Sequence, residues 1–224
     1  MTDVVRAGRS LLRRGSGSRG GRPLFLEISS VMHGHTLVEL LAVMSLLLVL
    51  LAVSVPTLTR AADEARTRGA AFQMSSRITL VRTKAVHRTA NVALRFEPVG
   101  DDWSFREYAD GDRDGVLSAD IAVGRDYPLT EPEQIRHGFR GVRFGFVAGC
   151  PLVDGNAVPQ DASPVRFGKA KMISFSPAGT VTSGTLYLKG RGVHGYAVVV
   201  LGATGRTRVL RCAPWSGTWV TNGR

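Results

Sequence analysis

The chain has 224 residues, enough for one domain with an appendage and for a packed hydrophobic core. With 44% hydrophobic and 21% charged residues, its composition is that of a folded protein and not of a disordered one. The formal net charge is +11, and residues 1–34 contribute six arginines and two acids, so the remainder stays basic at +7. This balance permits contact with nucleic acid or anionic lipid but identifies neither.

A long uncharged segment follows the arginine-rich start. No charged residue occurs between Glu39 and Arg60, and the run Leu40–Val55 is almost wholly apolar. At about 1.5 Å rise per residue, a helix from Thr36 to Val55 spans roughly 30 Å, the thickness of one hydrocarbon core. Because arginines precede it, we expect the N-terminus to stay in the cytoplasm and the rest of the chain to be exported.

Three interpretations of this segment compete. An arginine-rich start and an apolar centre are typical of a secretory signal peptide, although this apolar run is long for one. A plain membrane anchor is the second interpretation. The third assigns a role to Glu39, because a carboxylate at membrane depth costs about 2.5–3.5 kcal/mol on insertion scales and therefore usually has a partner and a function.

Residues 34–41, Gly-His-Thr-Leu-Val-Glu-Leu-Leu, resemble the leader motif of type IV pilins, in which glycine and an aromatic residue precede T-L-x-E-L. The resemblance implies cleavage by a prepilin peptidase after Gly34 and methylation of the new N-terminus at His35, where the motif usually has phenylalanine. It also implies roles in filament assembly for Glu39 and Pro56. The physical logic agrees, because the new ammonium of one subunit and Glu39 of its neighbour offset each other's desolvation when they pair within lipid.

Beyond Pro56 the pattern stays helical to about His87 and becomes amphipathic. We expect the first half of this helix to lie in the membrane and the second half to pack on a sheet. Small residues at Ala61, Ala65 and Gly69 allow another backbone to approach closely. The residues that recur at three- and four-residue spacing, and that we expect to form the packed stripe, are Leu58, Ala61, Ala62, Ala65, Phe72, Ser76, Thr79 and Val86.

After the helix the hydrophobic period changes to two, which predicts strands separated by glycine, proline and aspartate. One long helix followed by strands predicts an α+β fold, with an antiparallel sheet wrapped on the helix. The expected organisation is a leader at 1–34, a membrane and amphipathic helix at 35–88, and a periplasmic β-rich domain at 89–224. The candidate strands are Val92–Phe96, Trp103–Tyr108, Val142–Val147, Lys171–Phe175, Thr185–Leu188, Tyr196–Leu201 and Arg206–Arg211.

A second resemblance covers this part of the chain. Residues 81–94 are similar to the helix-to-strand junction of the GspH/FimT family. Residues 175–188 are similar to that family's F-x-P-x-G turn and the strand after it. Together with the leader motif, the resemblance spans most of residues 34–211. It implies a pilin-like fold and a minor pseudopilin of type II secretion or a minor type IV pilin.

The segment 110–115 reads D-x-D-x-D-G, the opening of an EF-hand calcium loop. Asp110, Asp112 and Asp114 would place three carboxylates around one hard cation. The twelfth position of such a loop is Ile121, where an EF-hand has glutamate. The alternatives are therefore a calcium site and a polar turn with no cofactor, since aspartate and glycine favour turns in any case.

Arg206 and Arg208 lie two residues apart in a predicted strand, so they share one face. FimT-like pilins that take up DNA have a similar G-R-x-R sequence near the C-terminus. The resemblance implies that Arg206 and Arg208 bind phosphates, independently of base sequence and in a salt-sensitive way. Lys189, Arg191 and Arg211 would join them if the hairpin folds back. The alternative is a solvated basic hairpin.

Cys150 and Cys212 are not a close pair and have no histidine cluster beside them, so we expect no zinc site. In an oxidising compartment they form one disulfide, and two separate buried thiols are the alternative. Trp215 and Trp219 either stack on bases or pack on the core.

The chain contains no G-x-S-x-G, H-E-x-x-H or phosphate-loop motif, so we expect no enzyme. We expect a minor pilin or pseudopilin, single-pass in a bacterial inner membrane, that joins a filament near its tip. Its partners would be other pilins, the prepilin peptidase and the inner-membrane assembly platform. The alternatives are a DNA receptor of a transformation pilus and an exported soluble protein whose mature form begins after Ala52.

Overall fold

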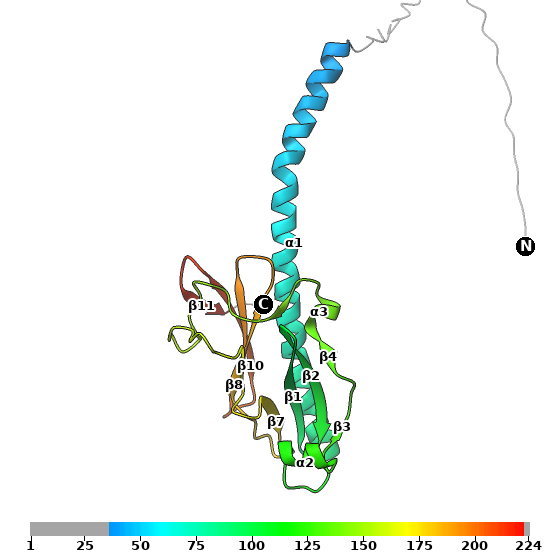
Figure 1. The fold of residues 1–224 in the computed structure, drawn as a ribbon, viewed down its shortest axis with the longest axis vertical. Helices are drawn as coiled ribbons and strands as arrows, with labels where there is room; N and C mark the ends of the chain where they lie inside the picture. The colour runs from blue at the N-terminus through cyan, green and yellow to red at the C-terminus, as the bar shows by residue number, and fades with distance from the viewer. Residues whose placement is uncertain (1–35, 222–224) are drawn as a thin grey trace, which may run out of the picture. The chain divides into compact units, whose positions relative to one another are not determined.

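The computed structural model describes residues 36–221, so the expected leader, the cleavage site at Gly34 and the methylation site at His35 lie outside the described residues. Figure 1 shows one long helix followed by strands and two short helices. In chain order the elements are α1 (Leu37–Arg88), β1 (Val92–Val99), β2 (Asp102–Ala109), α2 (Ser118–Val123), β3 (Tyr127–Pro128), β4 (Glu133–Gln134), α3 (Ile135–Gly138), β5 (Arg143–Phe144), β6 (Val165–Arg166), β7 (Met172–Phe175), β8 (Gly184–Lys189), β9 (Gly195–Val200), β10 (Thr207–Ala213) and β11 (Thr218–Thr221). The predicted α+β class is confirmed.

The strands form two antiparallel sheets where the sequence predicted one. Sheet A has the order β3-β2-β1-β7, with β4 also paired to β2. Sheet B has the order β11-β10-β9-β8-β5, with β6 also paired to β8. The expected strand Val142–Val147 shrinks to the two residues of β5. The strands β3, β4, β6 and β11 were not predicted. β3, β4 and β6 have two residues each, which is too short to carry a recognisable period.

The second half of α1 packs against both sheets through a stripe different from the predicted one. Leu58, Ala61, Thr79 and Val86 are exposed, so the predicted stripe is wrong. The prediction rested on three- and four-residue spacing, and the buried residues have the same spacing in a different phase. The buried stripe consists of Thr67, Ala70, Ala71, Met74, Ile78, Val81 and Ala85.

The main core joins this stripe to the facing sides of both sheets. Phe96 of β1 lies at its centre, with ring centroids 6.2 Å from Phe105, 5.8 Å from Phe144 and 6.3 Å from Phe167. Each fully buried side chain of this size stabilises the fold by about 1.5–3 kcal/mol. The core therefore holds α1, sheet A and sheet B together.

A buried carboxylate also ties α1 to sheet A. Glu107 of β2 is fully buried, and Nζ of Lys84 lies 2.5 Å from its Oε2. Nε of Arg77 lies 3.2 Å from Oε1, but these two atoms do not form a hydrogen bond. Arg77 instead donates to Glu133. The pairing fixes the rotation of α1 about its axis, because both cations must face β2.

Candidate functional site

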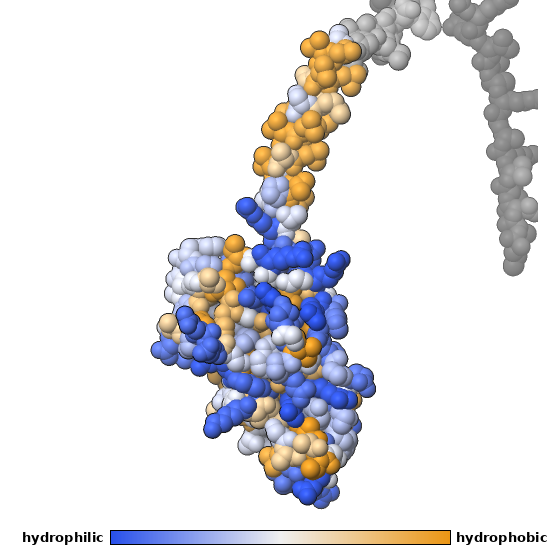
Figure 2. Space-filling view, viewed as in Figure 1, coloured by the Kyte–Doolittle hydropathy of each residue, from blue (hydrophilic) through white to orange (hydrophobic). Residues whose placement is uncertain are grey.

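The first half of α1 exposes an apolar surface on all sides. From Leu37 to Leu58, every large apolar side chain is between 48% and 74% exposed. In Figure 2 this part of the helix is mostly orange, with a few paler residues between the apolar ones. A soluble monomer rarely exposes an apolar patch of more than a few hundred Å². By length and composition, α1 is the one helix within residues 36–221 that can span a membrane.

The serine and threonine hydroxyls near Pro56 are satisfied within the helix. Ser54 and Thr57 each donate a hydroxyl hydrogen bond of 2.7 Å to the carbonyl four residues earlier. Pro56 lies between them and has no N–H, so the carbonyl of Ala52 lacks its usual helical donor. Hydroxyls bonded to the backbone are compatible with hydrocarbon, where polar groups find no water. This chemistry suits a helix that lies in lipid or among other apolar helices.

Glu39 has a local structural role that the sequence analysis missed. Thr36 precedes the first helical residue, and its Oγ1 accepts the backbone N–H of Glu39 at 3.3 Å. Thr36 and Glu39 thus have the T-x-x-E spacing of a capping box, and an acidic residue is favoured in the first turn by the helix dipole. Any test of Glu39 in assembly must therefore separate its charge from the capping of α1.

Arg206 and Arg208 are both exposed, at the β9–β10 turn and the start of β10. Thr207, between them, points the other way and lies 2.9 Å from Ser75 of α1. Arg82 of α1 joins this patch, since a Cβ on Gly205 would lie 3.1 Å from its guanidinium carbon. None of the three arginines has an acidic partner within 4 Å among residues 36–221. We call Arg82, Arg206 and Arg208 the distal basic patch.

The other three basic residues expected near this patch lie elsewhere. Lys189 and Arg191 lie at the opposite end of β8 and β9, because Lys189 pairs with Gly195 whereas Thr207 pairs with Val200. Arg211 lies on the face of sheet B that turns toward α1. The hairpin does fold back, because β9 pairs with both β8 and β10. The length of β9 nevertheless separates Lys189 and Arg191 from Arg206, and strand alternation turns Arg211 to the other face.

Arg211 belongs instead to a network around Glu64 of α1. Oε2 of Glu64 lies 2.5 Å from Nδ1 of His194, and Tyr196 donates its hydroxyl to Oε1. Arg211 donates to Nε2 of His194 at 3.1 Å. Since arginine only donates, Nε2 accepts and the Nδ1–H donates to Glu64. Burial and the hydrogen bond to Glu64 raise the pKa of Tyr196, which therefore stays protonated. The network locks α1 onto sheet B.

The loop after β2 brings Asp110, Asp112 and Asp114 together, with ligand oxygens within 4.8 Å of one another. Asp110 is buried and accepts four hydrogen bonds, from the side chain of Asn91 and the backbone N–H groups of Asp112, Arg113 and Gly115. Burial raises the pKa of Asp110, but these hydrogen bonds outweigh burial and lower it below the ordinary value.

The four donors occupy the four lone-pair positions of the Asp110 carboxylate, so it has none left for a cation. Asp114 is exposed, and its contact with Asp112 raises its pKa. A residue outside the motif, Asp126, completes the loop by accepting the N–H groups of Gly111 at 3.1 Å and Leu117 at 2.8 Å. This geometry favours the polar turn over calcium, and only the fold brings Asp126 to it.

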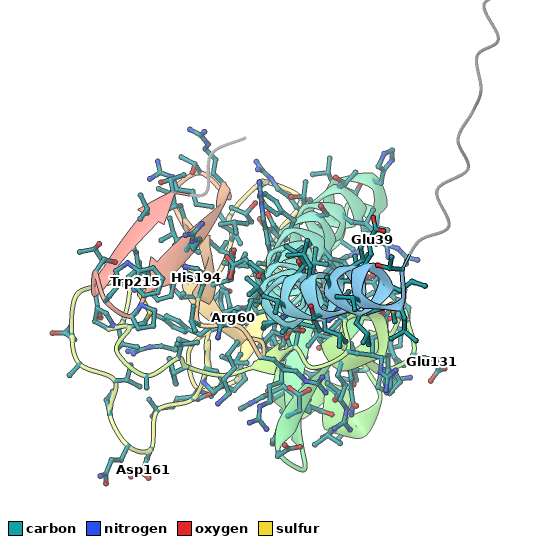
Figure 3. All side chains as sticks on the ribbon, turned by 90° about the horizontal axis from the view of Figure 1, so that it is seen from above. Glu39, Arg60, Glu131, Asp161, His194 and Trp215 are labelled. Atoms are coloured by element: carbon teal, nitrogen blue, oxygen red, sulfur yellow. A yellow bond between two sulfur atoms is a disulfide. The ribbon has the colours of Figure 1, made fainter. Side chains whose placement is uncertain are left out.

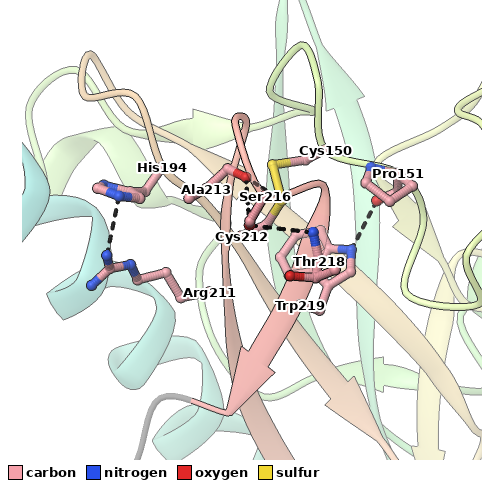
Figure 4. The surroundings of a disulfide bond; sticks show 9 residues. All are labelled: Cys150, Pro151, His194, Arg211, Cys212, Ala213, Ser216, Thr218 and Trp219. Atoms are coloured by element: carbon pink, nitrogen blue, oxygen red, sulfur yellow. Dashed lines mark hydrogen bonds between the residues drawn. A yellow bond between two sulfur atoms is a disulfide. The ribbon is translucent and has the colours of Figure 1, made fainter.

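Cys150 and Cys212 form a disulfide, with Cα atoms 6.1 Å apart (Figure 4). It ties the segment before β6 to β10. Nearby, Trp219 donates its Nε1–H to the carbonyl of Pro151 at 2.9 Å and packs on the outer face of sheet B. Trp215 differs, because it is 73% exposed; its ring contacts that of His194, with 5.2 Å between the centroids.

No family model matches the chain, and searches of curated proteins and of solved structures find no significant match. Two features of the described residues call for a partner. The first is the exposed apolar half of α1, which requires lipid or other apolar helices. The second is the distal basic patch, which is suited to anionic groups.

Proposed function

We propose that the chain is a membrane-anchored subunit of a helical filament, and more narrowly a minor pseudopilin of type II secretion or a minor type IV pilin. The observation that carries the proposal is a single helix with two different halves. Its first half is apolar and exposed on every side, and its second half is amphipathic and packs on two sheets. Such a helix holds the subunit in the inner membrane first and then bundles with its equivalents in the filament core.

Within this proposal, cleavage after Gly34 creates an ammonium at His35. Glu39 of one subunit then pairs with the ammonium of the next, inside the apolar bundle. Pairing there compensates both charges where water is excluded, so removing the carboxylate leaves an uncompensated ammonium. This cost gives the subunits a fixed axial register.

The N-terminus of the membrane form tests the cleavage. N-terminal sequencing should give a start at His35. A start after Ala52 would support a conventional signal peptide, and an intact arginine-rich leader on the assembled subunit would contradict the proposal.

Filament incorporation tests the role of Glu39, with Thr36 as the matched control. We expect Glu39→Ala to abolish incorporation and Thr36→Ala to retain it. Both variants remove part of the capping box, but only the first removes the charge. Equal loss in both variants would mean that Glu39 acts through helix capping alone.

A second candidate function, DNA capture by the filament, rests on the distal basic patch. Arg206 and Arg208 are exposed, Arg82 is partly exposed, and none of the three has an acidic partner in the described chain. Gel shifts of the full chain in detergent should show binding whose log affinity falls with log salt concentration. Arg206→Gln with Arg208→Gln should reduce that slope by about 2, one for each lost phosphate contact. The same change at Lys189 and Arg191 is the control, and an equal loss there would exclude a specific role for the patch.

A further inference from the structure

The end of the globular domain that α1 enters carries a second, larger group of cations. The β8–β9 turn lies against α1 at this end, where Gly190 faces Thr67 and Gly192 faces Glu64. Four cations at or beside this end have no acidic partner within 4 Å among the residues that the structure describes. They are Arg60, Arg140, Lys189 and Arg191.

Two of these cations, Lys189 and Arg191, border a cleft of about 460 Å³ between the β1–β2 turn, the segment after α3 and the β8–β9 turn. Asp101 offsets part of the charge by pairing with Arg143 at 2.6 Å and Arg136 at 3.8 Å. Asp102 is 2% exposed, and its Oδ2 has no hydrogen-bond donor among residues 36–221. The cleft therefore offers cations for a phosphate. Its basic lining consists of Arg136, Arg143, Lys189 and Arg191.

Two exposed apolar side chains accompany the cations. Val193, in the β8–β9 turn, is 58% exposed, and Trp215, in the β10–β11 turn, is 73% exposed. Figure 3, which views the domain from the side that α1 enters, shows Trp215 next to His194. Tryptophan is enriched where hydrocarbon meets headgroups, and cations beside apolar side chains are typical of surfaces that lie on a bilayer.

The spacing along α1 puts this surface within reach of the membrane. Glu64, beside the β8–β9 turn, comes nine residues after Val55, a rise of about 14 Å. A headgroup layer is roughly 5–8 Å thick. The remaining distance, from the outer edge of the headgroups to the level of Glu64, is less than the Debye length of about 10 Å at 0.1 M salt. The cations therefore lie within the field of an anionic bilayer.

We propose that this end of the domain docks on the surface of an anionic bilayer, with Trp215 and Val193 at the headgroup level and Lys189 and Arg191 on lipid phosphates. The proposal rests on the proposed membrane-spanning role of α1. Docking holds the waiting subunit against the membrane, and extraction into a filament must break it. The distal basic patch, at the other end of β10, stays free for a different partner.

The test uses the full chain in lipid nanodiscs, made either of phosphatidylcholine alone or with about one third phosphatidylglycerol. Lipids brominated near the headgroup quench tryptophan fluorescence, and the difference between the native chain and Trp215→Phe isolates Trp215 from Trp103 and Trp219. We expect strong quenching of Trp215 in the anionic discs and little in the neutral ones. Salt at 0.5 M should reduce it.

The double variant Lys189→Gln with Arg191→Gln should weaken docking about 25-fold, or fivefold for each charge, and so return quenching to the neutral-disc level. The matched control, Arg206→Gln with Arg208→Gln, removes the same charge at the far end of the domain. It should keep the quenching that the native chain shows in anionic discs. Equal quenching in both discs, or equal loss in both double variants, overturns the proposal. A chain that enters the discs without quenching of Trp215 refutes docking alone, whereas a chain that does not enter them also refutes the membrane anchor.

Discussion

Replacing Lys84 by methionine removes the closest cation from a fully buried carboxylate. Glu107 is 0% exposed, and Nζ of Lys84 lies 2.5 Å from it. Removing one partner of a buried pair typically costs about 3–5 kcal/mol, because the other charge stays buried without compensation. Arg77 remains 3.2 Å away and Lys84 itself is one-third exposed, so we expect the lower limit, about 3 kcal/mol.

Urea unfolding of the full chain in detergent, followed by tryptophan fluorescence, measures this cost. Glu107→Gln should cost less, about 1–2 kcal/mol, because Lys84 and Arg77 can then turn to solvent. The double variant should cost no more than Glu107→Gln alone, which gives a coupling energy of at least about 3 kcal/mol. Lys169→Met, at an exposed site, is the control and should stay within about 0.5 kcal/mol. Additive single effects, or a Lys84→Met variant as stable as the control, would refute the reasoning.

Three further predictions concern stability. Cys150→Ser with Cys212→Ser should lower the free energy of unfolding by about 4 kcal/mol in urea, from the entropy of a 62-residue loop. Gly190→Ala should lower it by about 2 kcal/mol, because the new Cβ would lie 2.0 Å from Oγ1 of Thr67; an unchanged melting temperature would contradict this contact. The lowered pKa of Asp110 stabilises the fold above about pH 4, and this contribution disappears as the pH falls through the folded-state pKa. Compared with the native protein, the Asp110→Asn variant should therefore be less stable at pH 7. Its free energy of unfolding should also fall less between pH 5 and pH 2.

Several features followed from local sequence patterns. The uncharged run before Arg60 predicted an apolar helix, and the change of period after His87 placed β1, β2, β7, β8, β9 and β10 to within a few residues. These predictions succeeded because hydrophobic periodicity and charge spacing are local properties. The disulfide was one of two alternatives that the sequence left open, and cleavage at Gly34 stays a prediction.

Other features depend on contacts between residues far apart in the chain, which no local pattern specifies. The face of α1 that packs on the sheets was mispredicted, because burial against β1, β7 and β8 selects that face and the upstream apolar segment does not. Arg82 joins Arg206 only through the β9–β10 turn, while Arg211 leaves them for Glu64 because strand alternation turns it toward α1. The amino-acid order alone thus determined where the long helix and most of the longer strands lie. The tertiary structure decided which charges meet, because pairing register and side-chain direction are set only once both sheets close on the helix.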